Sequence, residues 1–292
     1  MSIKPVVSLV AGLPTRDGNR VPLTRLVPGR GQDGGEAFRA MDPFLLMDHF
    51  GPMVLPPGTD AGFPPHPHRG FQTLTYLIQG AFRHRDSTGG SGLLRPGGAQ
   101  LMNAGSGIVH EEMPVAEQLE TGGPIEGVQL WINLPRAEKG SAPGYTDLQP
   151  ESLPWRTLPG GRIRVLAGTL AGVTGPARTP AKIAYAHLEL ESGARFEHAI
   201  PPGWIAAAVP LRGSIRIQDT TVPADSVARL GEGDAVQWEA LTPVSLMLLA
   251  GEPLREPLAH HGPFVMNTKA ELQQAFDDYQ AGRLGQIPAD HI

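Results

Sequence analysis

Three histidines and one glutamate occur at a spacing that suits metal binding. His66 and His68 are separated by one residue in the segment PPHPHRGFQTLTYLIQG, and His110 and Glu112 repeat that spacing 42 residues after His68. Residues two positions apart in a β-strand point to the same side, so each pair can converge on one point inside a barrel. Three neutral imidazoles and one carboxylate suit a divalent ion of intermediate hardness and leave coordination positions open. The pattern predicts a reactive metal site.

Each pair alone is weak evidence for a metal, because an H-x-H pair is more often exposed or simply hydrogen-bonded. The order of the two pairs strengthens the interpretation, with Gly80 and Gly98 between them at expected turns. The chain contains no cysteine, so any metal must be bound through nitrogen and oxygen. These donors accept iron, manganese, cobalt, nickel, copper or zinc.

Short apolar segments separated by glycine and proline predict that strands position these residues. The 292 residues include 37 glycines and 30 prolines, too many for a helical bundle, whereas 40% are hydrophobic and spread throughout. One helix is expected near the C-terminus, where Thr268 and Glu271 fit a capping box before Gly282. The apolar residues at helical spacing in this segment, which should pack on a barrel, are Leu272, Ala275, Phe276 and Tyr279.

An internal repeat predicts two related halves. The segment LIQGAF resembles LRGSI, and their glycines, Gly80 and Gly213, lie 133 residues apart. The segment PGGAQLM with Gly98 resembles GEGDAVQW with Gly233, at a separation of 135. We expect an N-terminal barrel over residues 1–135, a connecting segment over 136–161, and a C-terminal barrel with the helix over 162–292.

The same offsets predict that the C-terminal half holds no metal. They match the four candidate ligands to residues that form no ligand set, namely Ala199, Pro201, Ser245 and Met247. A shift of one position would restore His198 alone.

Charge and hydropathy exclude several classes of partner. The 24 Lys and Arg residues against 29 Asp and Glu residues give a net charge of −5, without a basic run, so direct nucleic-acid binding is not expected. No apolar stretch is long enough to span a membrane, and the first ten residues lack the pattern of a secretion signal. These features predict a soluble, cytoplasmic protein.

Several segments resemble, in order, the signature blocks of the pirin family. They span roughly residues 36 to 285 and read DPFLLMDHF, HPHRGFQT, NAGSGIVHEEMP, GVQLWINLP, LGEGD and GEPLREPLAHHGPFVMNT. The resemblance implies an all-β bicupin of two antiparallel, jelly-roll β-barrels with a short C-terminal helix. It also implies one metal, usually Fe(II), in the N-terminal barrel only, bound by the residues that match the family ligands: His66, His68, His110 and Glu112.

The resemblance supports two functions of different kinds. Some pirins resemble quercetin 2,3-dioxygenases, which implies a small phenolic substrate, O2, and Glu112 as metal ligand or catalytic proton acceptor. Other pirins are iron-dependent transcriptional co-regulators, which implies a redox-sensing site and a protein partner without turnover. An isomerase or small-sugar binder is a third reading, because cupin barrels host many chemistries.

Three further residues are candidates for the substrate pocket. Gln72 has the strand parity of His66 and His68, and should face the pocket if that strand continues without a bulge. Family members often carry glutamate at that place. By resemblance, the segment with Asp48 and Phe50 lies near the pocket mouth. Arg69 is expected in a structural ion pair, and the position of His84 alone does not decide between pocket and surface.

Overall fold

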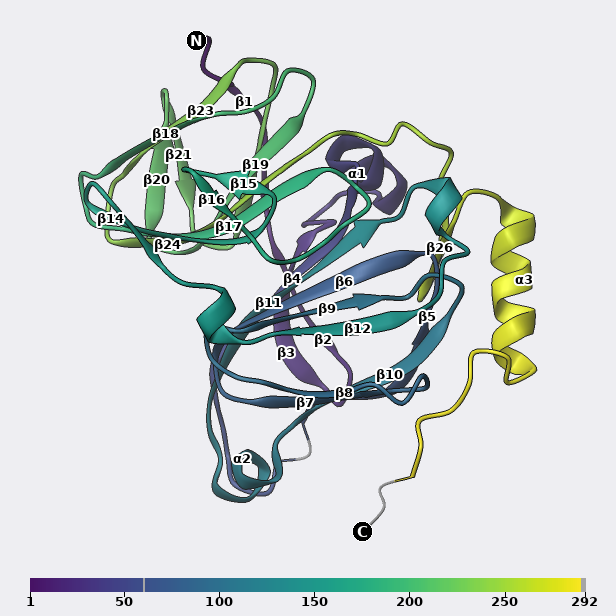
Figure 1. The fold of residues 1–292 in the computed structure, drawn as a ribbon. Coiled ribbons are helices and arrows are strands. Elements are labelled where there is room, and N and C mark those ends of the chain that lie inside the picture. Colours follow the sequence, from purple (N-terminus) through teal and green to yellow (C-terminus); the bar gives the residue numbers. More distant parts are fainter. Residues whose placement is uncertain (60, 290–292) are drawn as a thin grey trace. The chain divides into compact units, whose positions relative to one another are not determined.

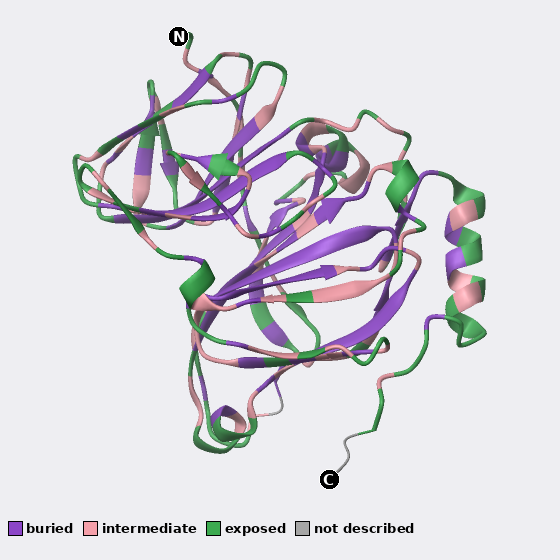
Figure 2. Ribbon diagram, in the orientation of Figure 1, coloured by how far each residue is buried: buried purple, intermediate pink, exposed green. Residues whose placement is uncertain are grey.

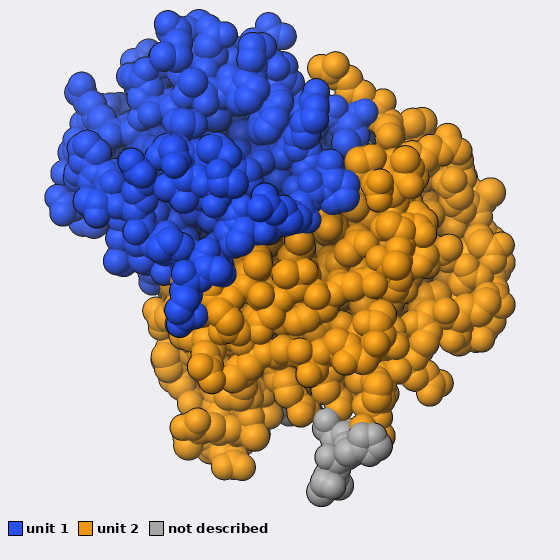
Figure 3. Space-filling model, viewed as in Figure 1, with its two compact units in different colours: residues 1–13, 24–49, 151–254 blue, residues 14–23, 50–150, 255–292 orange. Residues whose placement is uncertain are grey.

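Short strands and a few helices make up the chain in the computed structural model, which describes residues 1–59 and 61–289 (Figure 1). These residues form two compact units, drawn in blue and orange in Figure 3. Unit 1 comprises residues 1–13, 24–49 and 151–254, and unit 2 comprises residues 14–23, 50–150 and those from 255 onward. Each unit contains one four-stranded sheet and strands of one seven-stranded sheet.

Unit 2 contains the predicted ligand segments. Its four-stranded sheet has the order β5-β10-β7-β8, with bounds Phe63–His68, Ile108–Pro114, Phe82–Asp86 and Ser91–Leu94. The larger sheet has the order β12-β9-β6-β11-β4-β3-β2, with bounds Gly144–Leu148, Ala99–Asn103, Phe71–Gln79, Gly123–Asn133, Phe44–Leu55, Val21–Val27 and Leu13–Asp17. Strands β2, β3 and β4 include residues of both units. Helix α2 spans Ala116–Thr121.

Unit 1 repeats this arrangement. Its four-stranded sheet has the order β18-β23-β20-β21, with bounds Arg195–Ala199, Ala235–Ala240, Ser214–Ile217 and Thr220–Pro223. Its seven-stranded sheet has the order β1-β22-β19-β24-β17-β14-β13, with bounds Val6–Ala11, Ser226–Leu230, Ile205–Arg212, Val244–Gly251, Ile183–Leu190, Gly161–Ala167 and Arg156–Leu158. Helix α1 (Gly34–Met41) and the hairpin of β15 (Thr169–Leu170) and β16 (Val173–Thr174) complete it.

The shared strand order confirms the two related barrels. Gly80 connects β6 to β7, and Gly213 connects β19 to β20, the strands at the same places in unit 1. Both turns use the left-handed region that favours glycine, with φ of +88° and +75°. The predicted match of Gly98 to Gly233 is wrong. Gly98 precedes β9, which pairs with β6 and β12, whereas Gly233 precedes β23, which pairs with β18 and β20.

The C-terminal residues form a hairpin and the predicted helix. Strands β25 (Ala259–His261) and β26 (Phe264–Met266) pair, and α3 (Lys269–Gln280) follows. The capping box is confirmed, because the Thr268 hydroxyl accepts from the Glu271 amide and the Glu271 carboxylate accepts from the Thr268 amide. The apolar side of the helix packs with β26 and with Val109 of β10.

The two units divide the chain differently from the predicted linear boundaries. Residues 1–13 group with unit 1, where β1 pairs with β22. The hairpin β25-β26 and α3 group with unit 2, not with the residues that follow 162. The expected connection over 136–161 contains short 3-10 helices at Arg136–Glu138 and Pro150–Ser152, and it also supplies β12 to one sheet and β13 to another.

Buried apolar residues lie along the strands of both units. Buried residues follow the strands, and exposed residues concentrate in turns and on one side of α3 (Figure 2). In unit 1 the core includes Phe196 and Trp238, whose rings stack at 5.0 Å. None of the described helices has the length and apolar character needed to cross a membrane.

Candidate metal centre

Strand β5 presents the first two histidines. The Nδ1 atom of His66 lies 2.7 Å from the carbonyl oxygen of Pro64, and the Nδ1 atom of His68 lies 3.4 Å from that of Pro263. A carbonyl can only accept, so each Nδ1 carries a proton, and in the neutral imidazole the lone pair is then on Nε2. This is the tautomer that a metal-binding histidine uses when its second nitrogen donates to a backbone carbonyl.

Strand β10 brings His110 to the same place. His110 lies directly opposite His66 in the antiparallel register, so both side chains share one face. The His110 ring centroid is 4.3 Å from that of His66 and 5.0 Å from that of His68. One ligand atom from each ring can be chosen so that all lie within 4.8 Å of one another. The structure therefore gathers the three histidines that the spacing predicted.

The donors of this cluster fit a metal cation. His110 is buried, and neither of its ring nitrogens has a hydrogen-bond partner among the described residues. Burial, together with the neighbouring histidines, holds the pKa values of His68 and His110 well below the usual range. Neutral imidazoles with free lone pairs are the form that divalent metals bind.

Glu112 lies beside the histidines but points across the barrel. Its carboxylate accepts hydrogen bonds from the Thr75 hydroxyl at 3.1 Å, from the Gln129 amide at 2.9 Å, and from the Gln100 amide. These donors come from β6, β11 and β9 of the facing sheet. Among the described residues, the set of clustered ligand atoms contains the three histidines and not Glu112. Its role as a ligand stays a prediction.

Strand β7 adds a fourth histidine, His84, and a further carboxylate, Asp86, to the same inner face. His84 is directly opposite Glu112, and Asp86 is directly opposite His110. Both residues are fully buried, and the His84 Nε2 lies 3.0 Å from a carboxylate oxygen of Asp86. The His84 ring centroid is 5.4 Å from that of His110. His84 therefore belongs to the barrel interior. Strand β7 has the spacing H-x-D, as β10 has H-x-E, and this pattern in the sequence could have pointed to Asp86.

Aromatic rings line the other side of His68. Phe71 and Trp131 stack with ring centroids 4.2 Å apart, and each ring centroid lies 5.0 Å from that of His68. The Trp131 indole nitrogen donates to Gln129 at 3.1 Å, and Gln129 in turn holds Glu112. One polar chain thus links this aromatic pair to the carboxylate.

Gln72 does not share a face with the histidines. Strand β5 ends at His68, Gly70 turns the backbone with φ of +86°, and β6 of the other sheet begins at Phe71. Along β6, Thr75 faces Glu112, so Gln72 has the opposite parity. The expected parity is wrong because the strand does not continue through Gly70.

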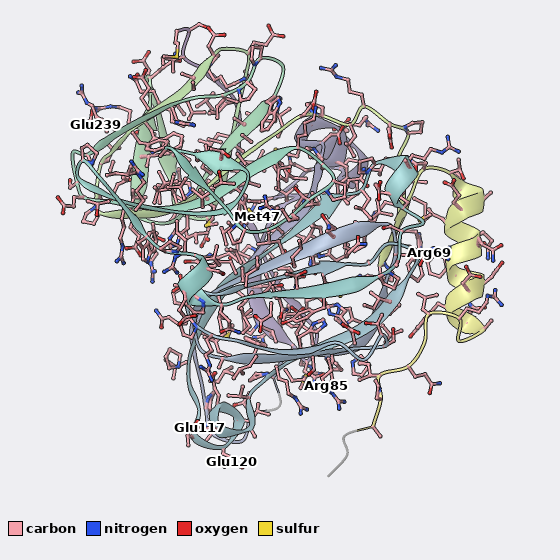
Figure 4. The ribbon with its side chains drawn as sticks, viewed as in Figure 1. Met47, Arg69, Arg85, Glu117, Glu120 and Glu239 are labelled. Atoms are coloured by element: carbon pink, nitrogen blue, oxygen red, sulfur yellow. The ribbon has the colours of Figure 1, made fainter. Side chains whose placement is uncertain are left out.

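The other pocket candidates have structural contacts. Asp48 belongs to unit 1 and accepts two hydrogen bonds from Arg25, at 3.0 and 2.9 Å. Phe50 belongs to the apolar core of unit 2, where its ring meets Phe82 at 5.9 Å. The predicted ion pair of Arg69 is confirmed: its guanidinium lies 2.5 Å from Asp278 of α3, and Figure 4 shows Arg69 beside that helix.

The equivalent positions of unit 1 are mostly apolar. Val236 lies opposite His198 on β23 and β18, as His110 lies opposite His66 on β10 and β5. Aligning the two four-stranded sheets in this way matches the candidate ligands to His198, Ile200, Val236 and Trp238. The offsets that matched Ser245 and Met247 are therefore wrong, since those residues lie on β24. The described residues contain one histidine cluster of this kind, in unit 2.

Two barrels of equal strand order, one with clustered histidines, define a bicupin, and comparison with known proteins identifies its family. Residues 24–132 match the family model described as Pirin, and residues 185–285 match the one described as Pirin C-terminal cupin domain. A pirin-like protein of Caulobacter vibrioides is 43% identical over 288 residues, covering 97% of this chain and 100% of that protein. Pirin of Mus musculus is 40% identical over 259 residues, covering 86% of each. The chain belongs to the pirin family.

A solved structure shares the whole fold. Quercetin 2,3-dioxygenase from Acinetobacter baumannii is 34% identical and superimposes with a TM-score of 0.90, covering 98% of this chain and 100% of that chain. The bicupin architecture expected from the sequence is thereby confirmed.

Proposed function

We propose that this pirin is a metal-dependent dioxygenase of the quercetin 2,3-dioxygenase type, which cleaves a flavonol or a related phenolic compound with O2. The observation that carries the proposal is the cluster of His66, His68 and His110, whose ligand atoms lie within 4.8 Å inside the barrel. The 34% identical structural relative named quercetin 2,3-dioxygenase supports the same reaction class.

The three histidines would hold one divalent metal, for which we propose Fe(II), with Glu112 either as a fourth ligand or as a proton acceptor beside it. When bound, the ion supplies Lewis-acid and redox chemistry toward a phenolate oxygen and O2. The tautomers set by Pro64 and Pro263 leave the Nε2 atoms of His66 and His68 available to it. The open coordination positions of a three-histidine site distinguish it from a closed structural site.

The remaining residues of the barrel handle the substrate. Glu112 is proposed as the proton acceptor for a substrate hydroxyl, with Thr75, Gln100 and Gln129 holding its carboxylate. Trp131 is only partly buried and lies beside His68, so its ring offers a face for a planar aromatic substrate. The burial of His68, His110 and Glu112 limits the access of water to the reacting groups.

O2 consumption with quercetin tests the proposal, using protein reconstituted anaerobically with Fe(II). We expect metal-dependent O2 uptake with release of carbon monoxide, lost in the His66→Ala variant because one nitrogen donor is removed. Glu112→Ala should bind metal yet turn over slowly if Glu112 accepts a proton. Stoichiometric metal binding without O2 uptake would contradict the enzyme and favour the non-catalytic co-regulator that the family resemblance also allows.

A further inference from the structure

We propose that residues 259–284, here called the C-terminal brace, orient His68 and strand β10 for metal binding. The brace comprises the hairpin β25-β26, α3 and the turn that follows the helix. The inference rests on the proposed metal centre. It adds that the affinity of this centre depends on residues nearly 200 positions away in the chain.

The hairpin contacts the backbone and side chain at the end of β5. The carbonyl of Pro263, 195 positions after His68, is the partner of the His68 Nδ1. The amide of Val265 donates to the carbonyl of Arg69 at 3.0 Å, and Arg69 and Phe264 form a parallel bridge. The hairpin thus runs beside the strand end and brings the carbonyl to the imidazole.

His66 and His68 differ in the origin of this partner. His66 uses Pro64, two residues earlier on its own strand, so its orientation is fixed locally. His68 has a longer contact, 3.4 Å, to a carbonyl that reaches it only if the hairpin is in place. Partners that orient metal-binding histidines typically change metal affinity by about 10- to 100-fold when removed. His68 is therefore the ligand that depends on the brace.

An ion pair fastens the brace to the residue that follows β5. The Arg69 guanidinium lies 2.5 Å from the Asp278 carboxylate, and both side chains are largely shielded, at 17% and 15% exposure. Asp278 also accepts from Gln274 and Arg283, each at 2.7 Å. The hydrogen bond from Arg69, with those from the other two residues, lowers the pKa of Asp278 to about 2. The carboxylate is ionised at neutral pH, so this pair is formed.

A second set of contacts reaches β10 beside His110. The carbonyl of Leu284 accepts from the Ser87 hydroxyl at 2.7 Å, and that hydroxyl accepts from the Val109 amide at 3.0 Å. The Val109 side chain packs in one cluster with Phe264 and Leu284. The brace therefore contacts the side chain of the residue that precedes His110, and it is linked to the backbone amide of that residue through Ser87.

The Gly70 turn joins these parts. The buried Lys139 ammonium donates to the carbonyls of Gly70 and Val265 at 2.6 and 2.9 Å, and to Asn133 at 2.7 Å. Any Cβ at position 70 would overlap the Val265 carbonyl, so glycine allows the hairpin to approach. The strand that ends with His68 and the hairpin that orients it are held by one side chain.

Co(II) binding to the full-length protein tests the proposal without requiring turnover. Its affinity is measured by competition with a chelator, and its visible absorption reports the ligand geometry. Asp278→Asn should weaken Co(II) binding about 10-fold and change the absorption spectrum, because His68 loses its fixed orientation. Hydrogen exchange at the Val265 amide should rise in the same variant.

Glu111→Gln is the matched control. Glu111 lies between His110 and Glu112 and pairs with Arg85 at 2.7 Å, with similar shielding, but this pair joins β10 to β7 and not to the brace. We expect its Co(II) affinity to stay within 2-fold of wild type. Equal losses in the two variants would overturn the proposal, as would an unchanged affinity or an unchanged Val265 exchange in Asp278→Asn. If the wild-type protein binds Co(II) but does not consume O2 in the quercetin assay, the proposed enzyme activity is contradicted. The proposal for the brace is unaffected by that result.

Discussion

His84 and Tyr145 stack face to face inside unit 2, with ring centroids 4.2 Å apart and an angle of 13° between the ring planes. His84 belongs to the four-stranded sheet and Tyr145 to β12 of the facing sheet, so the pair joins the two layers. Gly92 lies opposite His84 on β8, and a Cβ at this position would overlap the Tyr145 hydroxyl. Glycine at this position makes the stacking compatible with the barrel.

Gly92→Ala should therefore destabilise the protein. Overpacking of a filled interior typically costs about 1–3 kcal/mol, and Tyr145 must move to accommodate the methyl group. The free energy of unfolding in urea measures the effect. Gly144→Ala is the control, because it lies next to Tyr145 in the chain and its Cβ would meet open space. A loss no greater than that of the control would show that Tyr145 moves freely.

Gln129→Leu removes a donor from the buried carboxylate of Glu112 and the acceptor of the Trp131 indole. Leaving such groups unsatisfied costs about 1–3 kcal/mol each, so urea unfolding of the metal-free protein should show a loss in this range or above. Gln237→Leu, which loses only a contact to the exposed Glu197, should stay within about 0.5 kcal/mol of wild type. Similar values for the two variants would argue that Glu112 is not held by Gln129.

The buried Lys139 should make stability depend on alkaline pH. Burial lowers its pKa from 10.5 to about 8, so between these values the unfolded chain binds a proton that the folded chain has released. Over this interval a rising pH weakens the proton binding that favours the unfolded chain. The free energy of unfolding of wild type therefore increases from pH 8 toward pH 10.5. The difference in unfolding free energy between wild type and Lys139→Met should change in favour of wild type over this interval. A flat difference would mean that Lys139 has an ordinary pKa.

Removal of the metal should loosen unit 2 more than unit 1. The three histidines lie on β5 and β10, and the matched strands β18 and β23 carry mostly apolar residues in the interior. Chelation should therefore raise hydrogen exchange in β5 and β10 and leave β18 and β23 nearly unchanged. The same treatment of His66→Ala should have little further effect. Equal changes in both pairs of strands would contradict a site confined to unit 2.

That His110 joins His66 and His68 was expected from the order of the two motifs, whereas the shared face of each pair follows from strand alternation, a rule that requires only local geometry. The sequence predicted α3 for the same reason, since the Thr268 and Glu271 capping box acts over three residues. The two barrels were also predictable, because Gly80 and Gly213 end equivalent strands.

What the sequence could not predict depends on long-range pairing. The prediction that Gln72 shares a face with His66 and His68 was wrong, because the chain leaves one sheet and enters the other at Gly70. The partners of Glu112 come from three strands of the facing sheet, and no spacing in the chain brings Gln100 and Gln129 together. The match of Gly98 to Gly233 failed because two glycine-rich turns precede strands at different places in their sheets.

The interleaving of the two units along the chain has a consequence for biosynthesis. Unit 1 begins with β1 at the N-terminus, yet β1 pairs with β22, which the ribosome makes more than 200 residues later. Unit 2 also includes the hairpin and helix that follow all of its sheet strands in the chain, with the carbonyl that orients His68. The seven-stranded sheet of unit 1 therefore cannot be completed until β22 and β24 have been made, so β1 stays unpaired and open to aggregation during most of synthesis.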